Sequence, residues 1–272
     1  MKKLKIKRFF KSHIFFIIFS IIGSGLLLLI LLALLDMFIS QLVLNFNNFI
    51  SVITEWYVIK TILLTFYSSL IATIIAILLG IPLAYILAKY NFIGKSIIES
   101  FLNLPLMIPH SVAGLLIYSL FMERGLIGAP FKEIGIIFED HIWGIIVALL
   151  FVSMPIFINS AIDGFKNVDP HLERVAYSLG ARHRHVFFKI MLPLTKRPLF
   201  TGSVMCWARG ISEFGAVILI AYYPMIAPVL VYFRFNTTGL KGSAPIALFL
   251  IIICFVIFLV LYLLTKKPRK RY

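Results

Sequence analysis

Six apolar runs, each about 20 residues or longer, constrain this chain more than any other feature. Because about 20 helical residues cross the roughly 30 Å of hydrocarbon in a bilayer, each run can span a membrane. The predicted spans are Ile14–Leu35, Thr61–Ala88, Phe101–Met122, Ile142–Ile162, Leu199–Tyr223 and Ala244–Leu264. A chain that is 61% hydrophobic with a mean hydropathy of +1.02 also lies outside the range of soluble domains. The sequence therefore predicts an all-α membrane protein.

The basic residues indicate the orientation of these spans. If the amino terminus is inside, the inner segments hold 20 of the 26 Lys and Arg residues. Membrane proteins concentrate Lys and Arg in their cytoplasmic loops, so both termini are predicted to be cytoplasmic. Since the net charge of +15 comes from residues next to apolar runs, we interpret it as a topology signal rather than a nucleic-acid surface.

Residues 1–60 are predicted to hold a cytoplasmic segment, the first span and an outer loop. The first run follows six basic residues but is too long for a secretory signal, and no small-residue cleavage site follows it. Residues 61–264 form one predicted transmembrane domain, with Pro105 and Pro109 as ordinary kinks in its third span. Residues 265–272 form a basic cytoplasmic tail.

A charged hairpin at about residues 166–197 does not span the membrane. Asp169 is predicted to cap a helix that begins at Pro170, and Gly180 fits the left-handed residue that ends it. A basic linker leads to a second helical stretch, which Leu192 and Pro193 are expected to stop. The first helix has one apolar face, made by Leu172, Val175, Ala176 and Leu179. Such a helix lies on the membrane interface or in a groove of a partner protein.

The hairpin resembles the EAA signature of ATP-binding-cassette importer permeases. A glycine, nine residues and Ile-x-Leu-Pro match in full, and Val175 stands where alanine is usual. The matching positions are Glu173, Ala176, Gly180, Ile190, Leu192 and Pro193. The resemblance implies a type I importer fold with six spans per subunit, in which this helix couples the permease to a cytoplasmic ATPase. The coupling residues that the resemblance implies are Glu173, Val175, Ala176, Leu179, Gly180, Leu192 and Pro193.

The span from Trp207 to Pro228 closely resembles molybdate and tungstate permeases, with sulfate permeases as more distant relatives. This resemblance implies a homodimer in the cell membrane that is joined to two ATPase subunits. An extracytoplasmic binding protein would deliver the oxyanion. ATP and Mg would be bound by the ATPase, and no cofactor or metal is expected on this chain. A sulfate or thiosulfate importer is the alternative.

Arg209 and Glu213 form the ion pair predicted near the middle of a span, since residues four apart share one helical face. Charged groups at that depth cost about 2.5 to 3.5 kcal/mol each on insertion scales, so they face protein, a cavity or each other. We interpret the pair as a structural one in the bundle core, with a place on the pathway as the other reading. Ser203, Ser212, Gly210 and Gly215 are predicted to allow close packing against a second copy of the chain, with lining a narrow path as the other reading.

Other polar or small residues inside the spans receive plainer readings. His110 and Asn159 are predicted to be helix–helix hydrogen-bond partners, and Cys206 and Cys254 to be packing residues. The outer segment Tyr222–Tyr232 is either a re-entrant gate or an interfacial aromatic belt.

Two other classes of function fit the sequence less well. A secondary transporter would place ion-coupling carboxylates in several spans, whereas Glu213 is the single one expected here. An enzyme would need a nucleophile with a base or a metal motif, and none of the usual motifs occurs. The sequence also has no GxxxxGK[ST] phosphate loop, which assigns ATP to a partner.

Overall fold

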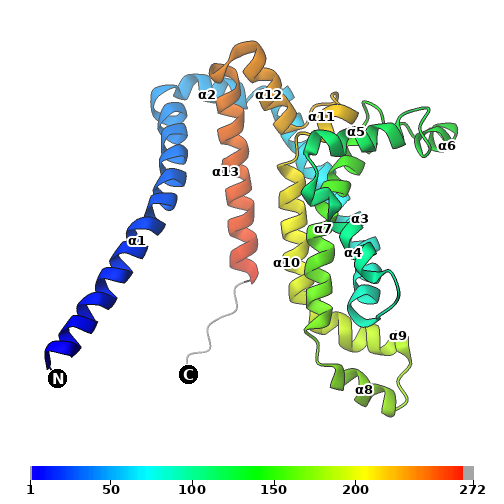
Figure 1. Ribbon diagram of the computed structural model, residues 1–272. Helices are drawn as coiled ribbons and strands as arrows, with labels where there is room; N and C mark the ends of the chain where they lie inside the picture. Colours follow the sequence, from blue (N-terminus) through cyan, green and yellow to red (C-terminus); the bar gives the residue numbers. More distant parts are fainter. Residues whose placement is uncertain (1, 266–272) are drawn as a thin grey trace. The chain divides into compact units, whose positions relative to one another are not determined.

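A computed structural model describes residues 2–265 of the chain, with side chains described at 15–261 and at Leu263. The described residues form helices and their connections, with no strand among them (Figure 1). The predicted all-α class is therefore confirmed. The chain divides into two compact units, one made of Met1–Glu55 with Arg234–Tyr272 and the other of Trp56–Phe233.

The first unit is built around the two terminal helices. It contains α1 (Lys2–Ile39), a π-helical turn η1 (Ser40–Leu44), α2 (Phe46–Ile53) and α13 (Leu240–Thr265). Helix α2 packs on α13, where the Asn48 side-chain amide donates to the Lys241 carbonyl at 2.9 Å. The apolar side chains of α1 from Phe15 to Leu35 are exposed. A helix with this surface needs a cover of lipid or other protein.

The core of the second unit is a packed group of three long helices. They are α3 (Trp56–Lys89), α7 (Ile142–Lys166) and α10 (Leu192–Ile211). Helices α3 and α10 each place a glycine against α7. A Cβ on Gly80 of α3 would lie 2.9 Å from the Phe157 ring, and one on Gly202 of α10 would lie 2.7 Å from Ser160 Cβ. Membrane helices associate closely through such small residues.

The predicted third span is not one straight helix. It consists of α4 (Lys95–Met107) and α5 (His110–Phe121), which meet at an angle of 113°. Ile108 has extended dihedrals because the ring of Pro109 disfavours helical geometry at the residue before it. Pro105 stays inside α4. The prediction of ordinary kinks is therefore wrong for Pro109, which ends a helix. The short helix α6 (Gly128–Glu133) follows.

The predicted fifth span also differs from the structure. Helix α10 begins at Leu192 and ends at Ile211, and the chain is then non-helical until α11 (Val217–Ile220). Helix α12 (Ala227–Thr238) follows. Within the described residues, four helices are long and apolar enough to cross a membrane, or five if α4 and α5 count as one span. The chain is thus a multi-pass membrane protein, and the predicted count of six spans is not confirmed.

Candidate functional site

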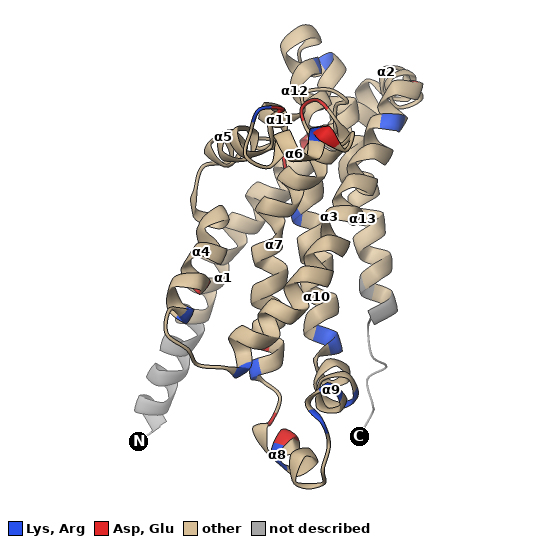
Figure 2. Ribbon diagram, turned by 90° about the vertical axis from the view of Figure 1, so that its right-hand side faces the viewer, with Lys and Arg blue, Asp and Glu red and all other residues tan. Residues whose placement is uncertain are grey.

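The predicted hairpin is a compact unit at one end of α7 and α10, and it carries a concentration of charged residues (Figure 2). It contains α8 (Pro170–Ser178), α9 (His183–Val186) and the π-helical turn η2 (Phe187–Met191). The predicted start of α8 is confirmed, because the His171 backbone N–H donates to Asp169 Oδ1 at 2.8 Å and Pro170 occupies the first helical position. That position lacks an intrahelical hydrogen-bond partner in any helix, so proline costs nothing there.

Gly180 ends α8 in the predicted left-handed conformation, with a φ of 82°. The Ala181 N–H donates to the Ala176 carbonyl at 3.0 Å, and the Gly180 N–H donates to the Tyr177 carbonyl at 2.9 Å. These two hydrogen bonds make a Schellman motif, which satisfies carbonyl groups that the helix end would otherwise leave unpaired. The turn from α8 to α9 therefore has a fixed geometry.

The predicted apolar face of α8 splits into an inner and an outer part. Ala176 is buried against the ends of α3 and α7, together with Leu87, Phe165 and Val186. Leu172, Val175 and Leu179 remain exposed, and Leu179 shows 82% of its surface. A monomer gains nothing by exposing a stripe of this kind. These three side chains therefore form an exposed apolar stripe on the outer side of α8.

Glu173 lies on the inner side of α8, where Lys89 Nζ approaches Glu173 Oε1 to 2.5 Å. Their side chains are 14% and 13% exposed, respectively. The neighbouring Tyr177 hydroxyl lies 2.9 Å from His183 Nδ1. Burial raises the pKa of Tyr177, and the charge of Glu173 raises it further. A polar network thus connects α8 with α3 and α9.

Leu192 and Pro193 do not stop the second helical stretch of the hairpin, so that prediction is wrong. The backbone passes from α9 through η2 into α10, with Pro193 in the first turn of α10. Proline has no N–H and its ring clashes with the preceding helical turn. The π-helical turn immediately before it changes the hydrogen-bond register at that place. The hairpin and α10 are therefore mechanically continuous.

Arg209 and Glu213 form the predicted ion pair, with Arg209 Nη2 at 2.8 Å from Glu213 Oε2. The prediction that the two residues share one helical face is wrong, because α10 ends at Ile211 and Glu213 lies in the connection that follows. The Glu213 side chain is 1% exposed. Its Oε1 accepts the Ala216 backbone N–H at 2.8 Å, and its Oε2 lies 3.7 Å from His110 Nδ1. The carboxylate is therefore both paired and hydrogen-bonded.

His110, the first residue of α5, completes this intramembrane cluster. Arg209 Nη2 lies 3.1 Å from His110 Nε2, so the predicted hydrogen-bonding role of the histidine is confirmed. Ser212 Oγ donates to the Arg209 carbonyl at 3.0 Å and stays exposed. A Cβ on Gly215 would lie 2.8 Å from His110 Cβ. The absence of a side chain at Gly215 thus lets α5 approach the chain after α10.

The position of the cluster along α3 follows from Gly210, which faces Ser69 in that helix. At 1.5 Å per helical residue, Ser69 stands about 20 Å from the start of α3 and about 30 Å from its end. The Arg209–Glu213 pair therefore lies near the middle of the longest helix in this unit. Ser69 Oγ also donates to the Trp207 carbonyl at 2.9 Å. Gly210 thus packs closely on α3 of the same chain, and its predicted packing against a second copy stays a prediction.

Three other predictions concern residues outside the hairpin and the intramembrane cluster. Asn159 Nδ2 donates to Asn103 Oδ1 at 2.6 Å, which joins α7 to α4 as predicted. Cys206 is fully buried, in agreement with a packing role. In the segment Tyr222–Tyr232, the Ala227 N–H donates to Thr65 Oγ1 at 2.8 Å. Whether this segment is a gate or an aromatic belt stays a prediction.

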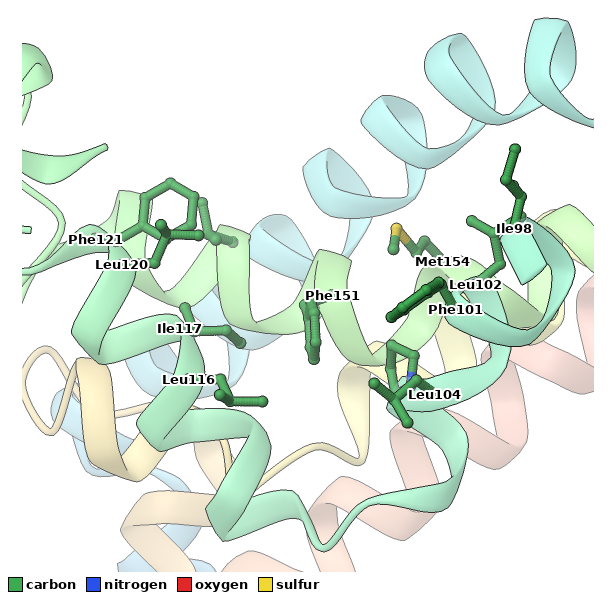
Figure 3. Close-up of a pocket in the computed structure, with 12 residues that line it drawn as sticks. Ile98, Phe101, Leu102, Leu104, Leu116, Ile117, Leu120, Phe121, Phe151 and Met154 are labelled. Carbon is green, nitrogen blue, oxygen red and sulfur yellow. The ribbon is translucent and has the colours of Figure 1, made fainter. Parts of the chain in front are cut away.

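A cavity of about 460 Å³ lies between α4, α5 and α7 (Figure 3). Its lining residues are all apolar, and Phe101, Leu116, Phe151 and Met154 point into it. An anion needs hydrogen-bond donors or positive charge to replace its water. This cavity offers neither, so it is not a site for an anionic substrate.

Lys89 and His110 are the two partners that the sequence reasoning did not find for Glu173 and Arg209. In the sequence, Lys89 is a topology signal, and its position at the end of an apolar run gives no hint of a partner in α8. His110 is far from Arg209 in the sequence. Both contacts depend on tertiary packing.

Comparison with known proteins agrees with this geometry. A molybdate/tungstate transport system permease protein of Pyrococcus abyssi is 39% identical to this chain over 93% of the chain and 96% of its own length. A probable sulfate transport system permease protein of Chlorokybus atmophyticus is 33% identical over 74% of this chain and 72% of its own.

The fold resembles a chain in the crystal structure of a bacterial alginate ABC transporter in complex with an alginate pentasaccharide-bound periplasmic protein. The two chains superpose with a TM-score of 0.68 at 16% identity, over 90% of this chain and 92% of the other. The predicted importer-permease fold is thereby confirmed. The protein family described as "binding-protein-dependent transport system inner membrane component" matches residues 76–270, and this chain belongs to that family.

Proposed function

We propose that this chain is the membrane permease subunit of an ATP-driven importer that carries molybdate or tungstate across the cell membrane. The observation that carries the proposal is its similarity, over nearly the whole of both chains, to a molybdate/tungstate permease. The sulfate permease relative is less similar and matches over a smaller part of both chains. An importer for sulfate or a related oxyanion is the second candidate.

Two copies of the chain would form the permease. His110 and Ser212 are exposed in a single chain, although His110 belongs to the intramembrane cluster and Ser212 is hydrogen-bonded to Arg209. Polar groups at this depth are disfavoured in contact with lipid. A second copy, or a water-filled path between two copies, would cover them. The exposed apolar side chains of α1 suit contact with lipid or protein.

Two cytoplasmic ATPase subunits would bind the hairpins of the two copies. The exposed stripe of Leu172, Val175 and Leu179 offers an apolar surface to a groove on such a partner. Glu173, Ala176 and Gly180 fix the position and the end of α8, and Leu192 and Pro193 continue the hairpin into α10. ATP and Mg would bind to the ATPase, so this chain would transport without catalysing hydrolysis itself.

An extracytoplasmic binding protein would bring the oxyanion to the opposite face. This part of the proposal is supported by the alginate transporter, whose structure contains a periplasmic binding protein. The concentration of Lys and Arg in the hairpin and near both ends of the chain favours cytoplasmic termini. Closure of the ATPase dimer would then move the hairpins and open the path outward, and hydrolysis would return it inward.

Uptake into proteoliposomes tests the proposal. The chain is reconstituted with its ATPase and binding protein, and ATP-dependent uptake of molybdate, tungstate and sulfate is measured under the same conditions. We expect molybdate or tungstate to be taken up in preference to sulfate. Preference for sulfate would favour the second candidate, and the absence of ATP-dependent uptake of any oxyanion would contradict both.

A further inference from the structure

Lys89 is the last residue of α3 and reaches across to Glu173 in α8. The two charged atoms are 2.5 Å apart, and about seven-eighths of each side chain is removed from water. A lysine in the last helical turn is also favoured by the negative end of the helix dipole. The pair is therefore a protected contact between a membrane span and the hairpin, not a surface ion pair that water and salt would weaken.

Few other contacts hold α8 on the long helices. Ala176 is the buried residue of α8, whereas Leu172, Val175 and Leu179 are exposed. Tyr177 packs against the same buried cluster as Tyr85 of α3. An isolated helix of only nine residues is not stable in water, so its position depends on these few tertiary contacts. Loss of the Lys89–Glu173 pair would remove the strongest polar contact among them.

The two arms of the hairpin connect to different spans. The α9 arm runs through η2 directly into the backbone of α10. The α8 arm follows α7 in the chain and is held on α3 by Lys89. Helices α3 and α10 also pack on α7 and on each other. A displacement of the hairpin therefore has covalent routes into α7 and α10 and a direct ionic route into α3.

We infer that Lys89 is a positioning residue whose ion pair with Glu173 makes α3 move together with α10 when the hairpin is displaced. The inference rests on the proposed role of the hairpin as the contact with the ATPase. In the absence of the pair, the ATPase still binds and hydrolyses ATP, but α8 loses its direct connection to α3, which then follows only through its packing on α7 and α10. Transport per ATP hydrolysed then falls.

The experiment compares Lys89→Met with the charge exchange Lys89→Glu/Glu173→Lys in the reconstituted complex. We expect Lys89→Met to lower the ratio of uptake to ATP hydrolysis about tenfold, within the usual range of coupling between sites. The charge exchange restores most of that ratio. Lys95→Met is the matched control, because it removes another inner lysine, whose Nζ contacts the Tyr90 carbonyl and Asn91 Oδ1 instead of α8. An unchanged ratio in Lys89→Met would overturn the inference.

Backbone hydrogen exchange of α8 tests the same pair without reference to substrate. We expect faster exchange at the amides of residues 173–178 in Lys89→Met, and exchange near the wild-type rate in the charge exchange and in Lys95→Met. If Lys89→Met does not assemble, Glu173→Gln replaces it, since it removes the charge and keeps the side-chain volume. If the α8 amides of Lys89→Met exchange at the wild-type rate, the pair does not hold α8 on α3, and the inference is wrong. Failure of the wild-type complex to transport oxyanions counts against the proposed function alone, because the exchange result stands without it.

Discussion

The hairpin and the intramembrane cluster each contain one ion pair, and the two pairs have different surroundings. Lys89 and Glu173 come from distant parts of the chain and are each about one-eighth exposed. Arg209 and Glu213 are four residues apart, and Glu213 is almost completely buried, with the Ala216 N–H and His110 as further partners. The first pair fixes the position of one helix on another. The second neutralises a carboxylate that folding has already removed from water, so its loss should affect folding itself.

The largest effect is expected for Arg209→Met. This change leaves the Glu213 carboxylate buried without its positive partner, and breaking a buried pair in this way costs about 3–5 kcal/mol. We expect a large loss of folded protein after extraction and a marked fall in the thermal midpoint of what remains. Thermal unfolding in detergent measures the fall, with Lys89→Met, which we expect to fold, as the comparison.

Arg209→Met/Glu213→Gln tests whether the buried charge is the cause. The double variant removes both charges, and the side-chain carbonyl oxygen of the introduced glutamine can still accept the Ala216 N–H. Replacing both members of a buried pair is often neutral, whereas removing one is not. We therefore expect the double variant to recover most of the stability. A double variant as unstable as Arg209→Met would show that the guanidinium acts through its contacts with His110 and Ser212 instead.

Gly180→Val gives the next largest effect and acts on the hairpin alone. A left-handed conformation costs a non-glycine residue about 1–2 kcal/mol, and a β-branched residue adopts it with particular difficulty. A Cβ at Gly180 would meet no atom within 4 Å, so the penalty comes from the backbone and not from crowding. We expect the variant to insert and fold but to lose most ATP-dependent uptake.

Gly180→Asn is the matched control for that change. Asparagine tolerates the left-handed region better than valine does and has a side chain of comparable size. We expect it to retain clearly more uptake than Gly180→Val in the same proteoliposome assay. Equal loss in both variants would point to a requirement for open space at Gly180, such as close contact with the ATPase, rather than to backbone strain.

Asp169→Ala is expected to have a smaller effect. It removes the side-chain oxygen that accepts the His171 N–H, and loss of such a cap costs about 1 kcal/mol. Pro170 still favours the start of α8, and the Lys89–Glu173 pair still holds the helix. Exchange of the first α8 amides should therefore accelerate about fivefold while uptake falls only modestly. Uptake reduced as far as in Gly180→Val would contradict this ranking.

The same difference in surroundings explains what the sequence could predict. The cap at Asp169, the start at Pro170 and the end at Gly180 were predictable because each depends on neighbouring residues. Pro109 accounts for the break at Ile108, but the angle of 113° between α4 and α5 depends on how the two helices pack, and the helix that continues through Pro193 depends on a π-helical turn. Spacing carries no signal for either of them.

The partners of the charged residues follow a similar rule. Spacing alone pairs Arg209 with Glu213, although α10 ends before Glu213 and the chain brings the carboxylate back by another route. The contacts of Lys89 with Glu173 and of His110 with Arg209 join distant segments, and residue types and spacing could not identify them.

Glu139, in the connection between α6 and α7, extends the comparison to a carboxylate outside the spans. A hydrogen bond from the Tyr118 hydroxyl lowers the pKa of Glu139, and the Glu123 N–H, which donates at 2.9 Å, and the charge of Lys132 lower it further. A lowered folded-state pKa stabilises the protein above the ordinary value of about 4.3, and this stabilisation is lost as the pH falls through the folded-state pKa.

Because Glu139 is partly exposed, water screens its interactions, and we expect a difference of about 1 kcal/mol or less. The measurement is the difference in thermal midpoint between Glu139→Gln and the wild-type protein, followed from neutral pH to about pH 3. The wild-type advantage should shrink as Glu139 becomes protonated, since the neutral forms of both side chains then make similar hydrogen bonds. A difference as large as that of Arg209→Met would mean that hydrogen-bond donors, and not burial, set the size of these effects.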